Sequence, residues 1–273
     1  MWRGVSMGAA MPFRDRSDAG KKLAAALEGF AGQAPVILAL PRGGVPVAAE
    51  VAARLHAPLD LVLVRKIGAP MQPELAMGAV VDGAPPIVVR NEDVIRAAMI
   101  GEADFNRVCS SELAEIARRR RRYLGERPRA EVKGRVVIVV DDGIATGATM
   151  KAALRATRLR GPKKLILATP VAASDTLRAL NSEVDEVVCL EDYEYLGAIG
   201  VYYADFSQTT DEEVVAALAR FPPSANPDKQ GAAPCSPGRR SATEDERSRA
   251  FGRTHPLRKA RCASSISRSP WPL

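Results

Sequence analysis

The stretch Val136 to Thr149, VVIVVDDGIATGAT, contains a short strand, a polar loop and the start of a helix. Its first five residues, Val136 to Val140, are β-branched and apolar, which predicts a strand buried on both faces, as in a parallel sheet. Asp141 and Asp142 follow, and small residues and hydroxyls continue to Thr149. After Thr149 the apolar spacing becomes helical, and Gly161-Pro162 is a helix stop.

The order of strand, loop and helix N-terminus creates a place where a phosphate group can bind. Backbone N–H groups and the positive end of the helix dipole converge near Thr146 to Thr149, and Gly147 allows the backbone to approach an anion closely. Two common phosphate loops do not match, because one requires a Lys before its Ser/Thr and the other requires G-x-G-x-x-G. The acidic pair would repel a phosphate unless it held something else, such as sugar hydroxyls or Mg²⁺. A ligand with a phosphate on one side and a diol on the other would suit both halves.

The segment resembles the 5-phosphoribosyl 1-pyrophosphate (PRPP) motif of type I phosphoribosyltransferases, a hydrophobic strand followed by D-D-x-x-x-T-G-x-T. The resemblance implies an α/β fold, with a Rossmann-like parallel β-sheet flanked by helices and a small hood. It implies that Asp141 and Asp142 hold the ribose 2′- and 3′-hydroxyls and, through these or through water, a Mg²⁺ cofactor. The 5′-phosphate would lie on five residues, Ala145, Thr146, Gly147, Ala148 and Thr149. The alternative is an ordinary strand–loop–helix turn with a solvated acidic pair.

An earlier stretch of the chain has the same order of elements. Val36 to Leu40 is a predicted buried strand, Pro41-Arg42-Gly43-Gly44 is a loop, and Pro46 is favoured near the start of a helix. In type I phosphoribosyltransferases a loop at this place receives the pyrophosphate. The resemblance therefore implies that Gly43 and Gly44 supply backbone amides and that Arg42 supplies a charge-assisted contact. Without that context, the R-G-G sequence would indicate a simple turn.

A third buried strand is predicted over Leu59 to Val64, and Arg65 and Lys66 follow it. Open α/β sheets bind ligands at the carboxyl ends of their strands. The resemblance assigns both cations to the pyrophosphate region, and a solvated strand end is the alternative.

Residues 67–80 contain two Gly and two Pro, and they are expected to form a mobile loop or an irregular hairpin closed by a short strand over Ile87 to Val89. Glu74 is the only ionisable residue of this segment. Hypoxanthine-type enzymes carry an Asp where this chain has Ala145, so oxopurine specificity is in doubt. The string DDGIATGATM is closer to adenine-type enzymes, whose general acid or base is a Glu on a mobile loop. Glu74 is the corresponding catalytic candidate, together with the acidic pair.

The later part of the chain supplies the remaining elements of the domain. Asp93 to Leu124 is expected to be largely helical, Ser174 to Leu180 is a predicted short helix, and further strands are predicted over Leu165 to Thr169 and Val184 to Leu190. Thr210 with Glu213 predicts a capping box for a last helix that ends near Arg220.

The hood is expected mainly over residues 191–210, which contain four of the five tyrosines. The segment resembles the hood of purine-type phosphoribosyltransferases, where an aromatic side chain covers the base. Flat rings suit a flat heterocycle, so the candidates for base stacking are Tyr193, Tyr195, Tyr202 and Tyr203. The alternative is that these rings pack the hood onto the sheet.

We expect a phosphoribosyltransferase domain over residues 12–220 and a disordered, basic, Pro/Ser/Arg-rich tail over residues 221–273. The tail carries ten Lys and Arg against four Asp and Glu, which accounts for +6 of the net charge of +7. The run Arg118 to Arg122 wraps all sides of a helix instead of forming one flat patch. Nucleic acid is therefore not expected as a partner.

The four cysteines form no C-x-x-C pair, which favours a reducing, cytoplasmic location over a disulfide framework or a zinc site. No apolar run approaches the roughly 20 residues that span a bilayer, so no membrane association is expected.

The function implied is transfer of a 5-phosphoribosyl group from PRPP to a nitrogenous base with release of pyrophosphate, as in purine salvage. The alternative is a regulatory module of the same fold that senses PRPP or nucleotides with weak or no catalysis. A homodimer is left open, as is the acceptor base.

Overall fold

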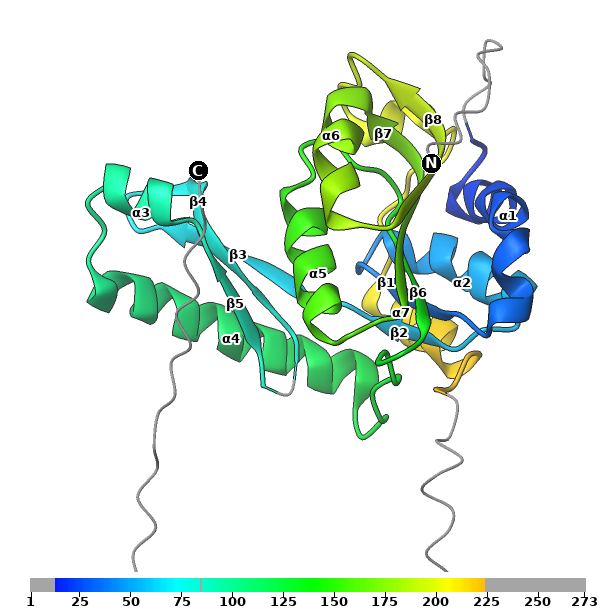
Figure 1. Cartoon of the computed structure of the whole chain (residues 1–273), viewed down its shortest axis with the longest axis horizontal. Helices are drawn as coiled ribbons and strands as arrows, with labels where there is room; N and C mark the ends of the chain where they lie inside the picture. Colours follow the sequence, from blue (N-terminus) through cyan, green and yellow to red (C-terminus); the bar gives the residue numbers. More distant parts are fainter. Residues whose placement is uncertain (1–12, 84, 224–273) are drawn as a thin grey trace, which may run out of the picture. The chain divides into compact units, whose positions relative to one another are not determined.

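The protein is described by a computed structural model that covers residues 13–83 and 85–223. Its centre is a five-stranded sheet in the order β2-β1-β6-β7-β8, with every neighbouring pair parallel (Figure 1). The strands are β1 (Val36–Ala39), β2 (Leu59–Leu61), β6 (Val136–Val140), β7 (Lys164–Ala173) and β8 (Glu186–Tyr193). The predicted parallel α/β architecture is confirmed.

Helices cover both faces of this sheet. They are α1 (Arg16–Ala26), α2 (Gly44–Leu55), α5 (Ala148–Leu159), α6 (Ser174–Leu180) and α7 (Asp211–Ala219), with short 3₁₀ turns η1 (Glu28–Gln33), η2 (Asn181–Glu183) and η3 (Ile199–Tyr202). The side chains of strand β6 are buried on both faces of the sheet. Ile138 and Val140 pack in one core with α1, α2 and α7. Val137 and Val139 pack in another core with α5 and α6. Successive side chains of a strand point to opposite faces. The continuous apolar run therefore indicates burial on both sides, as predicted.

The predicted strand Leu59 to Val64 is wrong, because these residues belong to two different sheets. Strand β2 ends at Leu61, and β3 (Val64–Ala69) pairs antiparallel with β4 (Gln72–Val81), which pairs with β5 (Ile87–Arg90). Between the sheets, Val62 and Leu63 are 4% and 2% exposed and lie in separate cores. The run looks continuous because the chain stays buried while it changes sheet. Arg65 and Lys66 consequently lie within β3 and not at the end of a parallel strand.

The segment 67–80 is an irregular hairpin, one of the two expected forms. The register of β3 against β4 shifts on both sides of Gly68, and the predicted short strand is present as β5. The long helical segment is two helices, α3 (Glu92–Ala97) and α4 (Glu102–Leu124). They are separated at Met99, which has a φ of 51°, and Gly101 caps α4.

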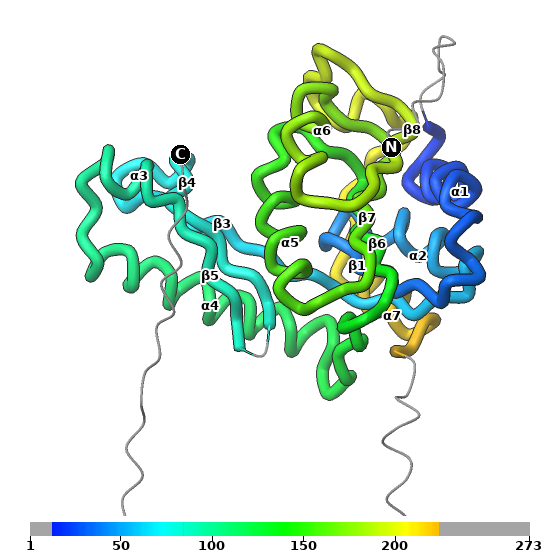
Figure 2. Tube along the Cα trace, in the orientation of Figure 1, coloured from blue at the N-terminus to red at the C-terminus, as the bar shows by residue number. Residues whose placement is uncertain are grey.

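The predicted hood segment contacts the N-terminal end of the described chain. Figure 2 shows α1 beside β8. The backbone of Phe13 forms hydrogen bonds with the residues before and after Tyr203. Phe13 N–H donates to Tyr202 O, and Ala204 N–H donates to Phe13 O, each at 2.7 Å. The capping box of Thr210 and Glu213 is present at the start of α7. The predicted tail lies outside the described residues from position 224 onward.

Candidate active site

Strands β1 and β6 lie side by side, and the chain leaves them in opposite directions. The connection through α2 leads to β2 on one side of β1, and the connection through α5 leads to β7 on the other side of β6. Such a reversal is the topological switch point at which open α/β sheets bind ligands. The R-G-G loop follows β1 and the acidic pair follows β6, so the structure brings these two predicted segments together at that point.

The two loops are in direct contact, and two glycines make that contact possible. A Cβ atom on Gly43 would lie 2.0 Å from Asp142 Oδ2, and one on Gly44 would lie 2.8 Å from Val140 O. Either distance is far below a normal contact, so side chains at these positions would push the loops apart. The R-G-G loop therefore does more than turn the chain. Because Gly43 and Gly44 have no Cβ atom, the loop can approach the acidic pair closely.

The two carboxylates have different surroundings. Asp141 Oδ1 accepts the backbone N–H of Asp142 at 2.9 Å. Burial, and next the nearby charge of Asp142, raise the pKa of Asp141 well above its ordinary range. Asp142 is instead paired with a cation, since Arg16 Nε donates to its Oδ2 at 2.7 Å.

Arg16 is a residue that sequence reasoning missed. Its side chain is 12% exposed, its Nη1 donates to Ser207 O at 2.6 Å, and its guanidinium lies 3.8 Å from the centre of the Phe206 ring. The hydroxyl of Tyr203 donates to Asp142 O at 2.5 Å. Arg16 of α1 thus holds the side chain of Asp142, and Tyr203 of the predicted hood segment holds its backbone carbonyl. Arg16 is 126 residues away from Asp142, and no local pattern connects them.

The tyrosines of the hood have unequal access to a ligand. Tyr203 is 5% exposed and packs between Phe13 and Phe206, with ring centres 5.4 and 5.0 Å away. Tyr193 and Tyr202 pack on each other at 4.6 Å. Tyr195 is 92% exposed. Three of the four rings therefore pack within the hood in this conformation, and their role in stacking on a base stays a prediction.

The predicted phosphate loop has the backbone features of an anion site. Gly147 is the N-cap of α5 with a φ of 71°, and no side chain of the described residues caps the first amides of this 12-residue helix. Ile144 anchors the loop, because its N–H donates to Val171 O at 2.9 Å and its carbonyl accepts from Ala173 at 3.0 Å. Thr176 Oγ1 donates to Ala145 O at 2.6 Å. The other loop residues, Ala145, Thr146, Ala148 and Thr149, are exposed.

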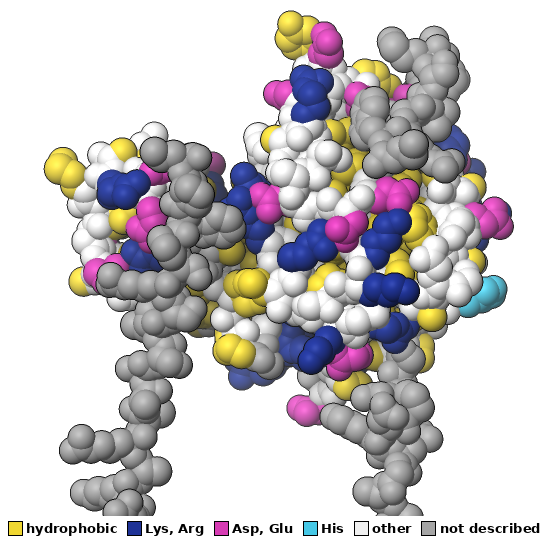
Figure 3. All heavy atoms as spheres, in the orientation of Figure 1, with side chains coloured by type: hydrophobic (Ala, Val, Ile, Leu, Met, Phe, Trp, Pro, Cys, Tyr) yellow, Lys and Arg dark blue, Asp and Glu magenta, His cyan; other side chains and the backbone are white. Residues whose placement is uncertain are grey.

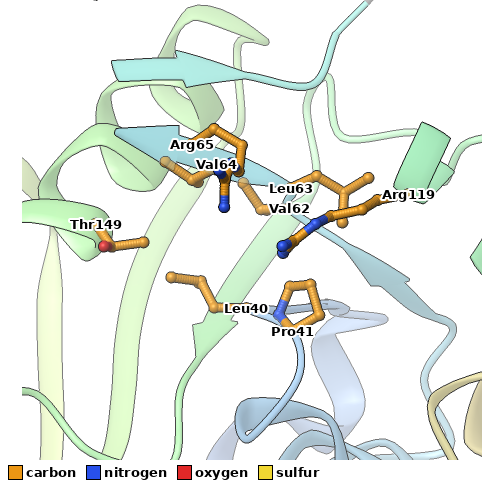
Figure 4. Close-up of a pocket in the computed structure, with 8 residues that line it drawn as sticks. All are labelled: Leu40, Pro41, Val62, Leu63, Val64, Arg65, Arg119 and Thr149. Atoms are coloured by element: carbon orange, nitrogen blue, oxygen red, sulfur yellow. The ribbon is translucent and has the colours of Figure 1, made fainter. Parts of the chain in front are cut away.

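The predicted cationic residues lie in three different surroundings. Arg65 lines a shallow hollow, open to solvent, between the R-G-G loop and the start of α5 (Figure 4). Arg42 Nη1 lies 3.8 Å from Asp211 Oδ1, at the start of α7. Lys66 Nζ pairs with Glu74 Oε2 across the hairpin at 3.0 Å, and the Glu74 side chain is 94% exposed. The catalytic role of Glu74 stays a prediction.

Two of the four cysteines lie among the described residues. Cys109 and Cys189 are free, and burial raises the pKa of Cys189 to about 12. A nucleophilic cysteine requires a lowered pKa. Within residues 13–83 and 85–223, no helix is both long and apolar enough to cross a membrane.

Comparison with known proteins identifies the family. The family model of the phosphoribosyl transferase domain matches residues 16–205. Two relatives from Mycobacterium tuberculosis, of strains CDC 1551 / Oshkosh and ATCC 25618 / H37Rv, are provisionally named phosphoribosyl transferases, and each is 47% identical over 208 residues. These matches cover 76% of this chain and 46% of each relative, so the chain spans about half the length of the curated relatives it matches.

Among solved structures, the crystal structure of TT1426 from Thermus thermophilus is similar, with 44% identity and a TM-score of 0.69. The similarity covers 78% of this chain and all of that one. The resemblance first indicated by the acidic motif is confirmed, and this chain belongs to the phosphoribosyl transferase domain family, a family of pentosyltransferases.

Proposed function

We propose that the chain transfers a 5-phosphoribosyl group from PRPP to a ring nitrogen of a heterocyclic base and releases pyrophosphate. The observation that carries the proposal is the meeting of three segments at the β1/β6 switch point. These are the acidic pair, the R-G-G loop in contact with it, and the uncapped start of α5. A diol, a diphosphate and a 5′-phosphate would each find a partner there.

In this mechanism the bond from C1′ to the diphosphate oxygen breaks and a bond from C1′ to the base nitrogen forms. The diphosphate leaves with the electron pair, and the nitrogen loses its proton to a general base. C1′ becomes positively charged in between, so the protein contributes mainly position and electrostatics. Asp141 and Asp142 would bind the ribose hydroxyls and stabilise the positive ring. The amide of Gly43, with Arg42, Arg65 and Lys66, would bind the leaving group. The predicted amide of Gly44 instead donates to Leu40 O at 3.1 Å in this structure.

Glu74 would serve the acceptor base as general acid or base. It would have to separate from Lys66 Nζ, which lies 3.0 Å from it here. Of the hood tyrosines, Tyr195 is the one whose ring is free to cover a base, because Tyr193, Tyr202 and Tyr203 pack on other aromatic rings.

The proposal includes Mg²⁺ that arrives with PRPP. Mg²⁺ is usually held by one or two carboxylates together with substrate phosphates. The donor set fits, since Asp141 and Asp142 are adjacent and the described residues contain no group of three or more His, Cys, Asp or Glu able to hold a metal alone. Asp141 and Asp142 would hold the ion through ribose hydroxyls or water, and it would neutralise charge on the leaving diphosphate.

The proposal extends to purine salvage in the cytoplasm, with the acceptor base left open. Ala145 offers no carboxylate to an oxopurine, which argues against a hypoxanthine-type acceptor. The free thiols of Cys109 and Cys189 are compatible with a reducing compartment.

Nucleic acid is not part of the proposal, because many basic side chains of the described residues pair with carboxylates. On the face in Figure 3, acidic side chains lie among the basic ones. Arg155 pairs with Glu183 at 2.7 Å and Arg158 pairs with Asp185 at 2.8 Å. Such pairs leave little free positive charge for a phosphate backbone.

The decisive experiment is incubation of the chain with PRPP, Mg²⁺ and a panel of purine and pyrimidine bases, read by mass spectrometry. Formation of one nucleotide with an equal amount of pyrophosphate is expected. Binding of PRPP without any nucleotide product would instead favour the regulatory alternative. Sedimentation of the same sample would determine whether the chain is a homodimer.

The site assignment has its own test. Asp141→Asn combined with Asp142→Asn should abolish PRPP binding in calorimetry while the protein stays folded. Asp93→Asn combined with Asp104→Asn is the matched control, because it removes two exposed carboxylates from α3 and α4. Unchanged PRPP affinity in the first double variant would contradict the assignment.

A further inference from the structure

The hollow beside the R-G-G loop contains a second arginine that the sequence does not assign to the site. It is lined by Leu40, Pro41, Val62, Leu63, Val64, Arg65, Arg119 and Thr149. Figure 4 shows the guanidinium groups of Arg65 and Arg119 pointing into the same space above Leu40 and Pro41, with Thr149 on the other side. Arg119 comes from α4, far along the chain from the other lining segments.

We propose that Arg119 binds the diphosphate of the substrate from α4, a role that rests on the proposed function. The hollow lies between the end of β1, where the R-G-G loop begins, and Thr149 in the first turn of α5. Among the described residues that line it, none is acidic and the two charged ones are both arginines. A diphosphate offers several oxygens to such a pair, and guanidinium groups bind them in a fixed, two-pronged geometry.

Arg119 can turn to an anion without leaving a carboxylate unpaired. Its partner Glu115 is shared, because Arg118 binds Glu115 through two bonds of 2.7 and 2.9 Å, whereas Arg119 binds it through one bond of 2.8 Å. The hydrogen bonds of Arg118 and then Arg119 lower the pKa of Glu115 to about 2, so it stays ionised. Arg118 alone can keep that charge paired after Arg119 has moved.

Arg65 has less freedom. Its Nε binds Glu112 Oε2 at 2.7 Å, and the Glu112 side chain is only 19% exposed. Among the ion pairs of the described residues, Glu112 has no second cation. Turning Arg65 to a ligand would leave a half-buried carboxylate without its partner, which is costly. Of the two arginines in the hollow, Arg119 can therefore turn fully to an incoming diphosphate, whereas Arg65 would bind it while its Nε keeps the bond to Glu112.

The rest of the arginine run serves other contacts. Arg120 pairs with Asp82 at 2.9 Å, and Arg122 pairs with Asp211 at 2.8 Å. Helix α4 packs against β3 and α7, and that packing directs position 119 to the hollow. A site residue on a packed helix is held more precisely than one on a loop.

Calorimetry on the full chain tests the proposal with two probes, inorganic pyrophosphate with Mg²⁺ and ribose 5-phosphate. Arg119→Gln should weaken pyrophosphate binding roughly ten- to hundredfold, the range expected for one charge-assisted hydrogen bond. It should leave ribose 5-phosphate binding unchanged. Arg107→Gln is the matched control, since it removes an exposed arginine of the same helix whose partner is Asp104, and it should leave both probes unaffected. Arg119→Lys should recover part of the pyrophosphate affinity.

Two results would overturn the proposal while the proposed function stands. In one, Arg119→Gln binds pyrophosphate as the wild type does. In the other, Arg119→Gln weakens the binding of pyrophosphate and of ribose 5-phosphate equally, which would mean that Arg119 acts by holding Glu115 and α4. A wild-type chain that binds neither pyrophosphate nor PRPP would instead refute the proposed function itself, and this inference with it.

Discussion

The contact between the R-G-G loop and the acidic pair predicts a large effect from one methyl group, in the variant Gly43→Ala. The backbone at Gly43 has φ −59° and ψ −36°, a helical conformation that alanine adopts without strain. The added methyl carbon would lie 2.0 Å from Asp142 Oδ2 and 2.6 Å from its Cγ. The effect of the substitution therefore acts through Asp142 and not through the backbone angles.

The size of the effect follows from the distance that the carboxylate must move. Normal contacts of a Cβ atom begin above 3.0 Å, so Asp142 has to shift by roughly 1 Å. The same oxygen accepts the 2.7 Å bond from Arg16 Nε, which this shift would disrupt. A hydrogen bond to a charged group contributes about 1.5–3 kcal/mol, and a displaced Asp142 would lose such a bond to PRPP. We expect PRPP affinity to fall roughly ten- to a hundredfold.

Calorimetric titration with PRPP and Mg²⁺ measures this loss in a double-mutant cycle. Asp142→Ala removes the carboxylate that the methyl group would strike, so Gly43→Ala should add almost nothing in that background. Gly29→Ala is the matched control, because it adds the same methyl group where no atom of the described residues lies within 4 Å. It should bind PRPP as the wild type does.

Two results would refute this reasoning. The first is a folded Gly43→Ala protein with wild-type affinity for PRPP, since the loops would then not be in contact. The second is a double variant in which the two losses add, since the methyl group would then act on something other than Asp142.

Three further predictions concern the same region. Gly147→Ala should weaken ribose 5-phosphate binding in calorimetry and lower the free energy of unfolding by about 1–2 kcal/mol, because φ is 71° and the methyl would lie 2.6 Å from Thr176 Cγ2; an unchanged affinity would contradict it. Arg16→Gln should lower the free energy of unfolding, measured in urea, by about 3 kcal/mol. It breaks the ion pair with Asp142, in which the two side chains are 12% and 14% exposed. Arg14→Gln is the control and should change little, because the Arg14 side chain is 72% exposed. Asp141→Asn should raise the Tm of the metal-free protein at pH 8 more than at pH 4. The raised pKa of Asp141 means that the folded state keeps a proton that the unfolded chain loses above about pH 3.8, so wild-type stability falls as pH rises beyond that value. A Tm difference that is independent of pH would refute the last prediction.

The elements that sequence predicts well are those whose physics is local. The strand Val136–Val140, the glycine at position 147 and the helix that follows lie within one short stretch, and the structure has them as predicted. The R-G-G loop follows its strand in the same way. A local pattern can therefore predict where amides and carboxylates lie at the edge of a sheet.

The change of sheet after Leu61 could not be predicted in this way. An apolar run shows that residues are buried, but it does not show against what. Val62 N–H still bonds to β1, through Ala39 O at 2.9 Å, whereas Leu63 O already accepts from Asp82, beside β4, at 2.8 Å. Both residues are buried throughout this change. Their hydrophobicity is the same as it would be in one continuous strand. The apolar pattern therefore cannot distinguish a single strand from a chain that changes sheet while it stays buried.

The charges around the site depend on packing over long sequence distances. Arg16 reaches Asp142 across 126 residues, and Arg119 reaches the hollow only because α4 packs on β3 and α7. In a helix each successive residue turns by about 100°, so the run Arg118 to Arg122 necessarily points in several directions. The sequence correctly predicts that this run forms no single patch, but the partner of each arginine depends on which surface faces it. The acidic motif predicts where ribose and 5′-phosphate would bind, and under the proposed function the tertiary structure would decide which cations surround the diphosphate.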